Sequence, residues 1–293
     1  MHLKKILVFI LLMGAIACQK KVADNIIAAG GFESTPVSKP LLPGILDEAS
    51  GIADSKTNPG YIWVQQDSGN PNDIALLSHD GSFLKNMNIK TAINRDWEDM
   101  LIANGPVAGI NYIYIADIGD NNLAYSQYNI YRFAEPGEAA VDVPGCDKIS
   151  FQYPDGSHNA EAILVDNNTK DIYIITKNDT PARIYKLLYP QNTSSVNTAM
   201  LSGTLSFNDV TAAAFSPDGK EIMVKTYSNI YNWKLKNGEN IEKKLAETPV
   251  TITYQFEPQG EAICFKNDNS GFFTLSERPS IIAAVNLNFY KRN

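Results

Sequence analysis

The sequence predicts an all-β protein, a five-bladed β-propeller whose last blade is closed by a strand from the N-terminal side. Two observations predict this fold: one segment recurs at nearly constant spacing, and each copy precedes the same succession of strand and turn patterns. The recurring segments begin at Glu48, Glu98, Glu161, Thr211 and Glu261, which are 50, 63, 50 and 50 residues apart. Repeats of this length with four short strands each are typical of propeller blades. A six-bladed propeller is the alternative.

Each repeat is expected to contribute four strands in the same order. The first strand begins at the residue named above and continues through small and apolar residues. A turn rich in Asn, Asp, Gly and Pro comes next, and β-branched and aromatic residues then predict further strands. The expected second strands are 61–64, 112–116, 171–176, 221–225 and 272–275. The third strands are 73–78, 129–133, 183–188, 229–235 and 280–286, and the fourth are 83–89, 148–153, 199–207 and 249–254.

The fifth repeat ends without a fourth strand of its own. Residues 36–45, which precede the first repeat, are expected to supply that strand and so close the ring. The one longer spacing indicates an insertion of thirteen residues near 117–122 or 137–145. A β-sandwich is the other all-β fold to consider, but a sandwich does not require equal repeats.

The first strands of all blades are expected to line a central channel. Small side chains are needed where five strands crowd together around one axis. The first strands provide them at Ala49, Ser50, Gly51, Ala162, Ala212, Ala213, Ala214 and Ala262.

The first 17 residues form a predicted export signal. Two lysines precede a short apolar run, and its Ala-Ile-Ala end stands directly before Cys18. Such a run is too short to span a bilayer, and a cysteine at this point suits lipidation in a bacterial lipoprotein. Residues 18–33 are then the lipidated cysteine and a tether, and residues 34–293 form one propeller domain. An uncleaved anchor is the alternative.

Composition limits the classes of partner. The 293 residues are 44% hydrophobic and 19% charged, which excludes a disordered chain. The net charge of −7 argues against a nucleic-acid binder, which needs a basic face. Loss of Lys4 and Lys5 with the signal makes the charge −9, a sign that suits cation binding. We expect a monomer, exported and anchored by lipid to the outer membrane or cell-envelope surface, or facing the periplasm.

The residues that open the first strands are expected to form a ring at one mouth of the channel. Four of them are glutamates, and carboxylates so close together repel one another unless a cation neutralises them or some stay protonated. Calcium prefers six to eight oxygen ligands, whereas zinc prefers His and Cys. The alternative is that the glutamates cap backbone groups or pair with Arg95, Arg183 or Arg278. The predicted calcium ligands are Glu48, Glu98, Glu161, Thr211 and Glu261.

Polar loops are expected to gather at the same mouth. Function commonly resides on such loops above a rigid scaffold. His158 is the candidate general base, with Asp117 and Asp120 as further catalytic candidates; a hydrogen bond within a loop is the alternative for His158. The candidate ligand-binding residues are Asp67, Asn70, Arg95, Trp97, Asn121, Lys177, Asn178 and Arg278. Cys146 and Cys264 fall on non-adjacent blades, so no disulfide is expected between them.

Four motifs carry a resemblance to known proteins. They are Glu-Ala-Ser-Gly-Ile-Ala, Trp-Val-Gln-Gln-Asp-Ser-Gly-Asn, Asp-Trp-Glu-Asp-Met and Asp-Ile-Gly-Asp-Asn. They resemble the bacterial SdiA-regulated-type and phytase/esterase-like propellers. The ring is also similar to that of calcium-dependent apyrases, which are five-bladed with Glu and Ser around an axial calcium. The resemblance implies calcium at the ring, whereas the apyrase substrate loops have no match here.

Two functions fit these patterns. The first is an envelope lipoprotein whose calcium-bearing mouth binds a small molecule or an envelope component, with hydrolysis of esters, lactones or phosphoesters as the candidate reaction. The second is a non-catalytic scaffold or recognition propeller in which the metal is structural. Enzymes and scaffolds share this fold, so the fold does not choose between them.

Overall fold

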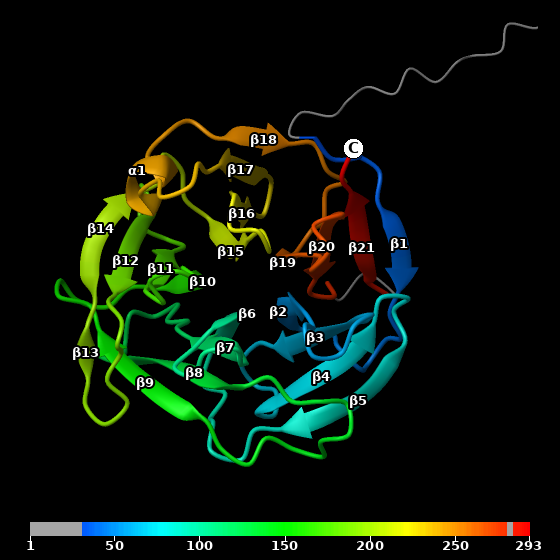
Figure 1. Cartoon of the computed structure of the whole chain (residues 1–293), viewed down its shortest axis with the longest axis horizontal. Helices are drawn as coiled ribbons and strands as arrows, with labels where there is room; N and C mark the ends of the chain where they lie inside the picture. The colour runs from blue at the N-terminus through cyan, green and yellow to red at the C-terminus, as the bar shows by residue number, and fades with distance from the viewer. Residues whose placement is uncertain (1–30, 280–283) are drawn as a thin grey trace, which may run out of the picture.

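The computed structural model describes residues 31–279 and 284–293 as a five-bladed β-propeller (Figure 1). Five antiparallel sheets stand around a central axis, each with its first strand innermost. The prediction of five blades is confirmed. The expected signal sequence, Cys18 and nearly all of the expected tether lie outside the described residues.

Alternating β-branched and aromatic residues form the four strands of each blade, as expected. The first blade is β2 (Ala49–Asp54), β3 (Tyr61–Gln66), β4 (Asp73–Ser78) and β5 (Phe83–Asn88). The second is β6 (Trp97–Asn104), β7 (Asn111–Asp117), β8 (Tyr128–Ala134) and β9 (Asp147–Gln152), with the two-residue β13 (Asn197–Thr198) parallel to β9. The third is β10 (Ala160–Val165), β11 (Ile172–Thr176), β12 (Arg183–Leu187) and β14 (Met200–Thr204). The fourth is β15 (Val210–Phe215), β16 (Glu221–Thr226), β17 (Ile230–Lys234) and β18 (Val250–Ile252).

The fifth blade joins the two ends of the described chain. Its strands β19 (Gly260–Phe265), β20 (Gly271–Ser276) and β21 (Asn286–Lys291) are completed by β1 (Val37–Pro40), which pairs antiparallel with β21. This is the predicted closure by an N-terminal strand, and Figure 1 shows β1 beside β21 at the rim. Phe32, which fell within the expected tether, is fully buried and bridges to Arg292. The propeller therefore begins a few residues earlier than expected.

Two features departed from the expected pattern. The insertion occupies both proposed places, as long loops after β7 and after β8. A short helix, α1 (Ile241–Leu245), follows β17, where no helix was expected. Its buried residues Ile241 and Leu245 cover the apolar layer between the third and fourth blades.

The five inner strands pack closely around the channel, as expected from their small side chains. A Cβ on Gly51 would lie only 2.6 Å from the backbone nitrogen of Met100 on the next blade. Asp99 is fully buried within the channel wall and accepts hydrogen bonds from the backbone N–H groups of Met100 (2.8 Å) and Ile163 (2.9 Å). Because Ile163 belongs to the third blade, Asp99 ties the inner strands of two neighbouring blades together.

Two further findings concern cysteines and membranes. Cys146 and Cys264 are free thiols, in agreement with the expectation that they do not pair. Within residues 31–279 and 284–293, no helix is both long and apolar enough to cross a bilayer.

Candidate metal centre

Each inner strand carries a β-bulge near its start, and the bulged residues form a ring at one mouth of the channel. In all five blades the pairing of the first and second strands skips one residue at this point. A bulge turns its extra residue away from the ladder, which is why bulges often re-aim side chains at functional sites. The skipped residues are Ser50, Glu98, Glu161, Thr211 and Glu261.

The prediction that Glu48 belongs to this ring was wrong by two residues. Ser50 holds the bulge position of the first blade and is fully buried, whereas Glu48 is exposed. Glu48 instead accepts a hydrogen bond from the side-chain amide of Asn70 (2.6 Å). Alignment of the five repeats by sequence similarity placed Glu48 at the ring position of the first blade. The position of a bulge depends on strand pairing, which the sequence alone does not give. The other four predicted ring members do occupy bulges.

Three ring glutamates converge. Glu98, Glu161 and Glu261 each offer a carboxylate oxygen, and these oxygens lie within 4.8 Å of one another. The three side chains are almost fully buried, with 3%, 2% and 5% of their residue surface exposed. Oxygen ligands at this spacing suit a hard cation such as calcium, whose bonds to oxygen are about 2.3–2.6 Å long.

Glu98 differs sharply from its neighbour Asp99. Asp99 collects backbone N–H donors, but no described residue donates a hydrogen bond to the Glu98 carboxylate. Burial raises the pKa of Glu98 well above its usual value, and the nearby charge of Glu161 raises it further. A buried carboxylate without a donor is costly unless it is protonated or bound to a cation.

A second carboxylate group extends the cluster outward from Glu98. Asp67, Asp96 and Glu98 also offer oxygens within 4.8 Å of one another. Asp67 lies in the loop after β3, and Asp96 lies just before β6; both are half-buried. Burial raises the pKa of Asp67 to about 6, and burial also raises the pKa of Asp96. Gly119 closes this side, since any Cβ there would collide with Glu98 Oε1 and Asp96 Oδ2.

Lys177 supplies a positive charge to the inner part of the cluster. Its Nζ lies 2.5 Å from Glu161 Oε1 and donates to the Tyr227 hydroxyl (2.8 Å). The Tyr227 hydroxyl donates in turn to Glu261 Oε1 (2.7 Å). Even so, burial raises the pKa of Glu161 to about 8, and Glu161 Oε2 is buried without a hydrogen-bond partner among the described residues.

The three catalytic candidates are engaged in local structure. His158 is buried, with Nε2 at 2.9 Å from the Tyr185 hydroxyl and Nδ1 at 2.9 Å from Asp179 Oδ2. Asp117 accepts from the backbone of Asp96 (2.9 Å). Asp120 accepts from Ala124 N, Tyr125 N and the Tyr128 hydroxyl, at 2.7, 2.9 and 2.8 Å. These contacts hold loops, which is the alternative expected for His158.

The ligand-binding candidates separate into two sets. Asp67 and Lys177 belong to the cluster. Asn70 lies beside it and donates to Glu48. Asn121 accepts a hydrogen bond from the side-chain amide of Asn159, which also donates to Glu161. Trp97, another ligand-binding candidate, is instead fully buried in the apolar core and donates to Ile93 O (3.0 Å). The remaining candidates are occupied or outlying: Arg95 donates to Gln127 O and Asp117 O, Arg278 pairs with Asp47, and Asn178 is exposed.

Several residues of the cluster were not predicted. Asp96, Tyr227 and Glu277 all lie at this mouth, and burial together with the charge of Glu261 raises the pKa of Glu277 to about 8. Asp96 lies two residues before Glu98, and this short spacing is the sequence feature that could have identified Asp96 as a member of the cluster. Tyr227 and Glu277 follow second strands at matching positions of two blades, which only the assembled ring makes visible.

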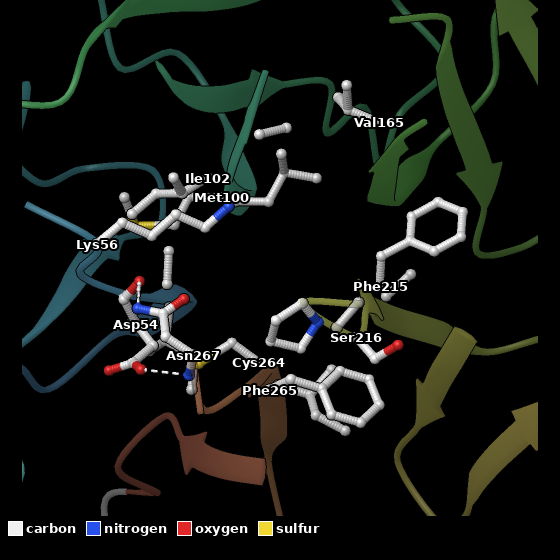
Figure 2. Close-up of a pocket in the computed structure, with 18 of the residues that line it drawn as sticks. Asp54, Lys56, Met100, Ile102, Val165, Phe215, Ser216, Cys264, Phe265 and Asn267 are labelled. Atoms are coloured by element: carbon white, nitrogen blue, oxygen red, sulfur yellow. Dashed lines mark hydrogen bonds between the residues drawn. The ribbon is translucent and has the colours of Figure 1, made fainter. Parts of the chain in front are cut away.

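The opposite end of the channel is different in character (Figure 2). A cavity of about 60 Å³ opens there, lined mainly by apolar side chains such as Ile52, Met100, Phe215 and Phe265. The cavity is therefore remote from the carboxylate cluster, although the same five strands build both ends. We identify the carboxylate cluster as the candidate site because of its chemistry, although the cavity lies at the other end of the channel.

The comparisons with known proteins give no family. No protein-family model matches the chain, and no curated protein matches it significantly. Among solved structures, the chain is similar to the Dos1 propeller, at 12% identity over 83% of this chain and 68% of that one, with a TM-score of 0.38. It is also similar to the β-propeller domain of Myceliophteria thermophila Cps50 (Swd1), at 9% identity over 84% of each chain, with a TM-score of 0.42. Kuenenia stuttgartiensis hydrazine synthase is similar at 8% identity over 78% and 80%, with a TM-score of 0.41.

Proposed function

We propose that this propeller binds calcium at its acidic mouth and uses the bound cation to hold an anionic group of a small ligand. The observation that carries the proposal is Glu98, a carboxylate with only 3% of its residue surface exposed and no hydrogen-bond donor among the described residues. It stands between two further pairs of carboxylates. A cation at this point relieves both the repulsion and the loss of hydration.

The ligand set favours calcium among common metals. Every candidate ligand atom of the two groups is a carboxylate oxygen, and the groups contain no His or Cys. Calcium accepts such a set at variable geometry, whereas magnesium needs a near-ideal octahedron and zinc prefers nitrogen and sulfur. Export through the predicted signal and Cys18 agrees with this choice, since extracellular calcium modules work at modest affinity.

A ligand site is favoured over a purely structural metal. Asp67 and Asp96 are half-buried, so the outer side of the cluster is reachable from solvent. Open coordination positions there suit an oxygen of a phosphate, carboxylate or ester. Asp67, Asp96 and Glu98 would hold the cation on this side, and a bound calcium would supply the polarisation that hydrolysis of an ester, lactone or phosphoester needs. The chain's own contribution is the fixed ring and Lys177, which orients Glu161.

The test is a calcium titration of the full chain after treatment with EDTA, followed by calorimetry. We expect saturable binding, and we expect Glu98→Gln to weaken it about 100-fold, the scale on which disturbed metal sites lose affinity. Asp218→Asn is the matched control, because Asp218 is a turn carboxylate hydrogen-bonded to Ser216 on the opposite side of the blade. Absence of calcium binding in the unmodified chain would refute the proposal. Assays of phosphoester, lactone and ester cleavage with and without calcium then decide whether the bound ligand is hydrolysed.

A further inference from the structure

We infer that the acidic mouth holds two divalent cations, one inner and one outer, which share the carboxylate of Glu98. This inference rests on the proposed calcium site and specifies how many cations that site holds. The inner position lies among Glu98, Glu161 and Glu261, and the outer position among Glu98, Asp67 and Asp96.

The distances separate the two positions. Within each group the ligand oxygens lie inside 4.8 Å, but the five carboxylates do not form one group at that limit. Oxygen atoms on one calcium are at most about 5 Å apart, because each bond is about 2.3–2.6 Å long. Glu98 alone belongs to both groups, so two cations, one at each group, would share its carboxylate.

Glu98 has the properties of a bridging ligand. Its carboxylate is almost fully buried and receives no hydrogen bond from a described residue, so both oxygens are available. Oε1 lies over Gly119 beside Asp96 Oδ2, which directs it toward the outer position. The inner position has its own unpartnered oxygen, Glu161 Oε2, which is buried. The inner position thus has a buried oxygen without a partner among the described residues, and the outer position shares the Glu98 carboxylate, to which no described residue donates.

The charge of the cluster agrees with two cations. When ionised, the five carboxylates of the two groups and the ammonium group of Lys177 carry a net charge of −4, and Glu277 adds another carboxylate to the same mouth. Two divalent cations offset this charge more fully than one. A single divalent cation leaves a charge of −2 in a largely buried space.

Two cations at bridging distance suit a ligand with two oxygens on one centre, such as a phosphoryl group. Pairs of metal ions about 3.5–4 Å apart clamp such groups in many hydrolases. Solvent reaches the outer position, because Asp67 and Asp96 are half-buried, whereas Glu161 and Glu261 at the inner position are almost fully buried.

The number of bound calcium ions tests this inference directly. Equilibrium dialysis of the full chain against radioactive calcium should give two ions per chain. Asp67→Asn with Asp96→Asn should leave one, Glu161→Gln with Glu261→Gln should also leave one, and Glu98→Gln should weaken both at least tenfold. The control pair, Asp218→Asn with Asp268→Asn, changes two turn carboxylates outside the cluster and should keep two ions.

The outcomes distinguish the two proposals. One ion per chain, removed equally by either pair of substitutions, overturns the two-cation centre and leaves the single calcium site standing. Two ions that are lost independently of Glu98 also overturn the sharing. No bound calcium at all refutes the calcium site itself. Near-ultraviolet circular dichroism of each variant shows whether its tertiary packing is retained, so that a lost ion is attributed to a lost ligand.

Discussion

The two ends of the central channel are built by the same five strands, but they differ in whether their buried carboxylates have partners within the protein. At the cavity end, both oxygens of Asp54 have partners. Oδ1 lies 2.6 Å from His79 Nε2. Oδ2 accepts from Asn267 N at 2.7 Å, and Figure 2 shows Asp54 beside Asn267. At the acidic end, Glu98 has no donor among the described residues. Both carboxylates are buried, with 6% and 3% of the residue surface exposed.

This contrast teaches that burial of a charge does not by itself mark a functional site. Asp54 and Asp99 are buried carboxylates that hold strands together, because backbone and side-chain donors satisfy them. Glu161 keeps a buried oxygen without a partner, and Glu98 receives no hydrogen bond from a described residue. Both lie among other carboxylates. A fold retains such an arrangement only if something outside the chain stabilises it or if the groups stay protonated.

The sharpest test of the contrast is removal of calcium, which should destabilise the protein through the acidic end alone. Calcium at about 100 times its dissociation constant stabilises the folded chain by about 2.7 kcal/mol. For a chain of this size that corresponds to about 5–10 °C in melting temperature. Thermal unfolding with calcium and with EDTA measures the difference. Equal melting temperatures would show that the acidic end, like the cavity end, needs no cation.

The blades were predictable from the sequence, whereas the composition of the cluster was only partly predictable. The equal spacing of Glu161, Thr211 and Glu261 reflects blades of equal length, and this spacing can be read from the sequence without any three-dimensional information. The place of Ser50 in the ring depends on a bulge, which is a property of strand pairing. Asp67 and Asp96 join Glu98 from separate loops, and such a meeting depends on loop conformation that no spacing encodes.

The pH dependence of stability should differ between the calcium-free and the calcium-bound forms of the protein. Burial raises the pKa values of Glu161 and Glu277 to about 8 in the calcium-free chain, above the value of about 4.3 in an unfolded chain. The folded state therefore binds more protons between these values, and its stability falls as the pH rises from 5 to 8. A fall of about 1 kcal/mol per pH unit is the expected scale. Calcium needs ionised ligands, so saturating calcium should cancel or reverse the slope.

Urea unfolding at several pH values, with EDTA or with calcium, measures both slopes. A calcium-free chain whose stability rises between pH 5 and 8 would contradict the raised pKa values. Parallel slopes in the two forms would contradict the link between these carboxylates and the cation. The cavity end is the internal reference, since Asp54 has its donors whether or not calcium is present.

The smallest expected effect comes from Asp54→Asn, which tests the cavity end without touching the acidic end. The amide keeps the size of the carboxylate but loses the charge that faces His79 and Asn267, so the free energy of unfolding should fall by about 1–2 kcal/mol. Calcium affinity should stay within twofold of the unmodified chain, because Asp54 stands at the far end of β2 from the ring. Calorimetric titration and urea unfolding of the same sample give both quantities. A large loss of calcium affinity would mean that the two ends are coupled through the inner strands, and the separation of roles argued from Glu98 and Asp54 would then be wrong.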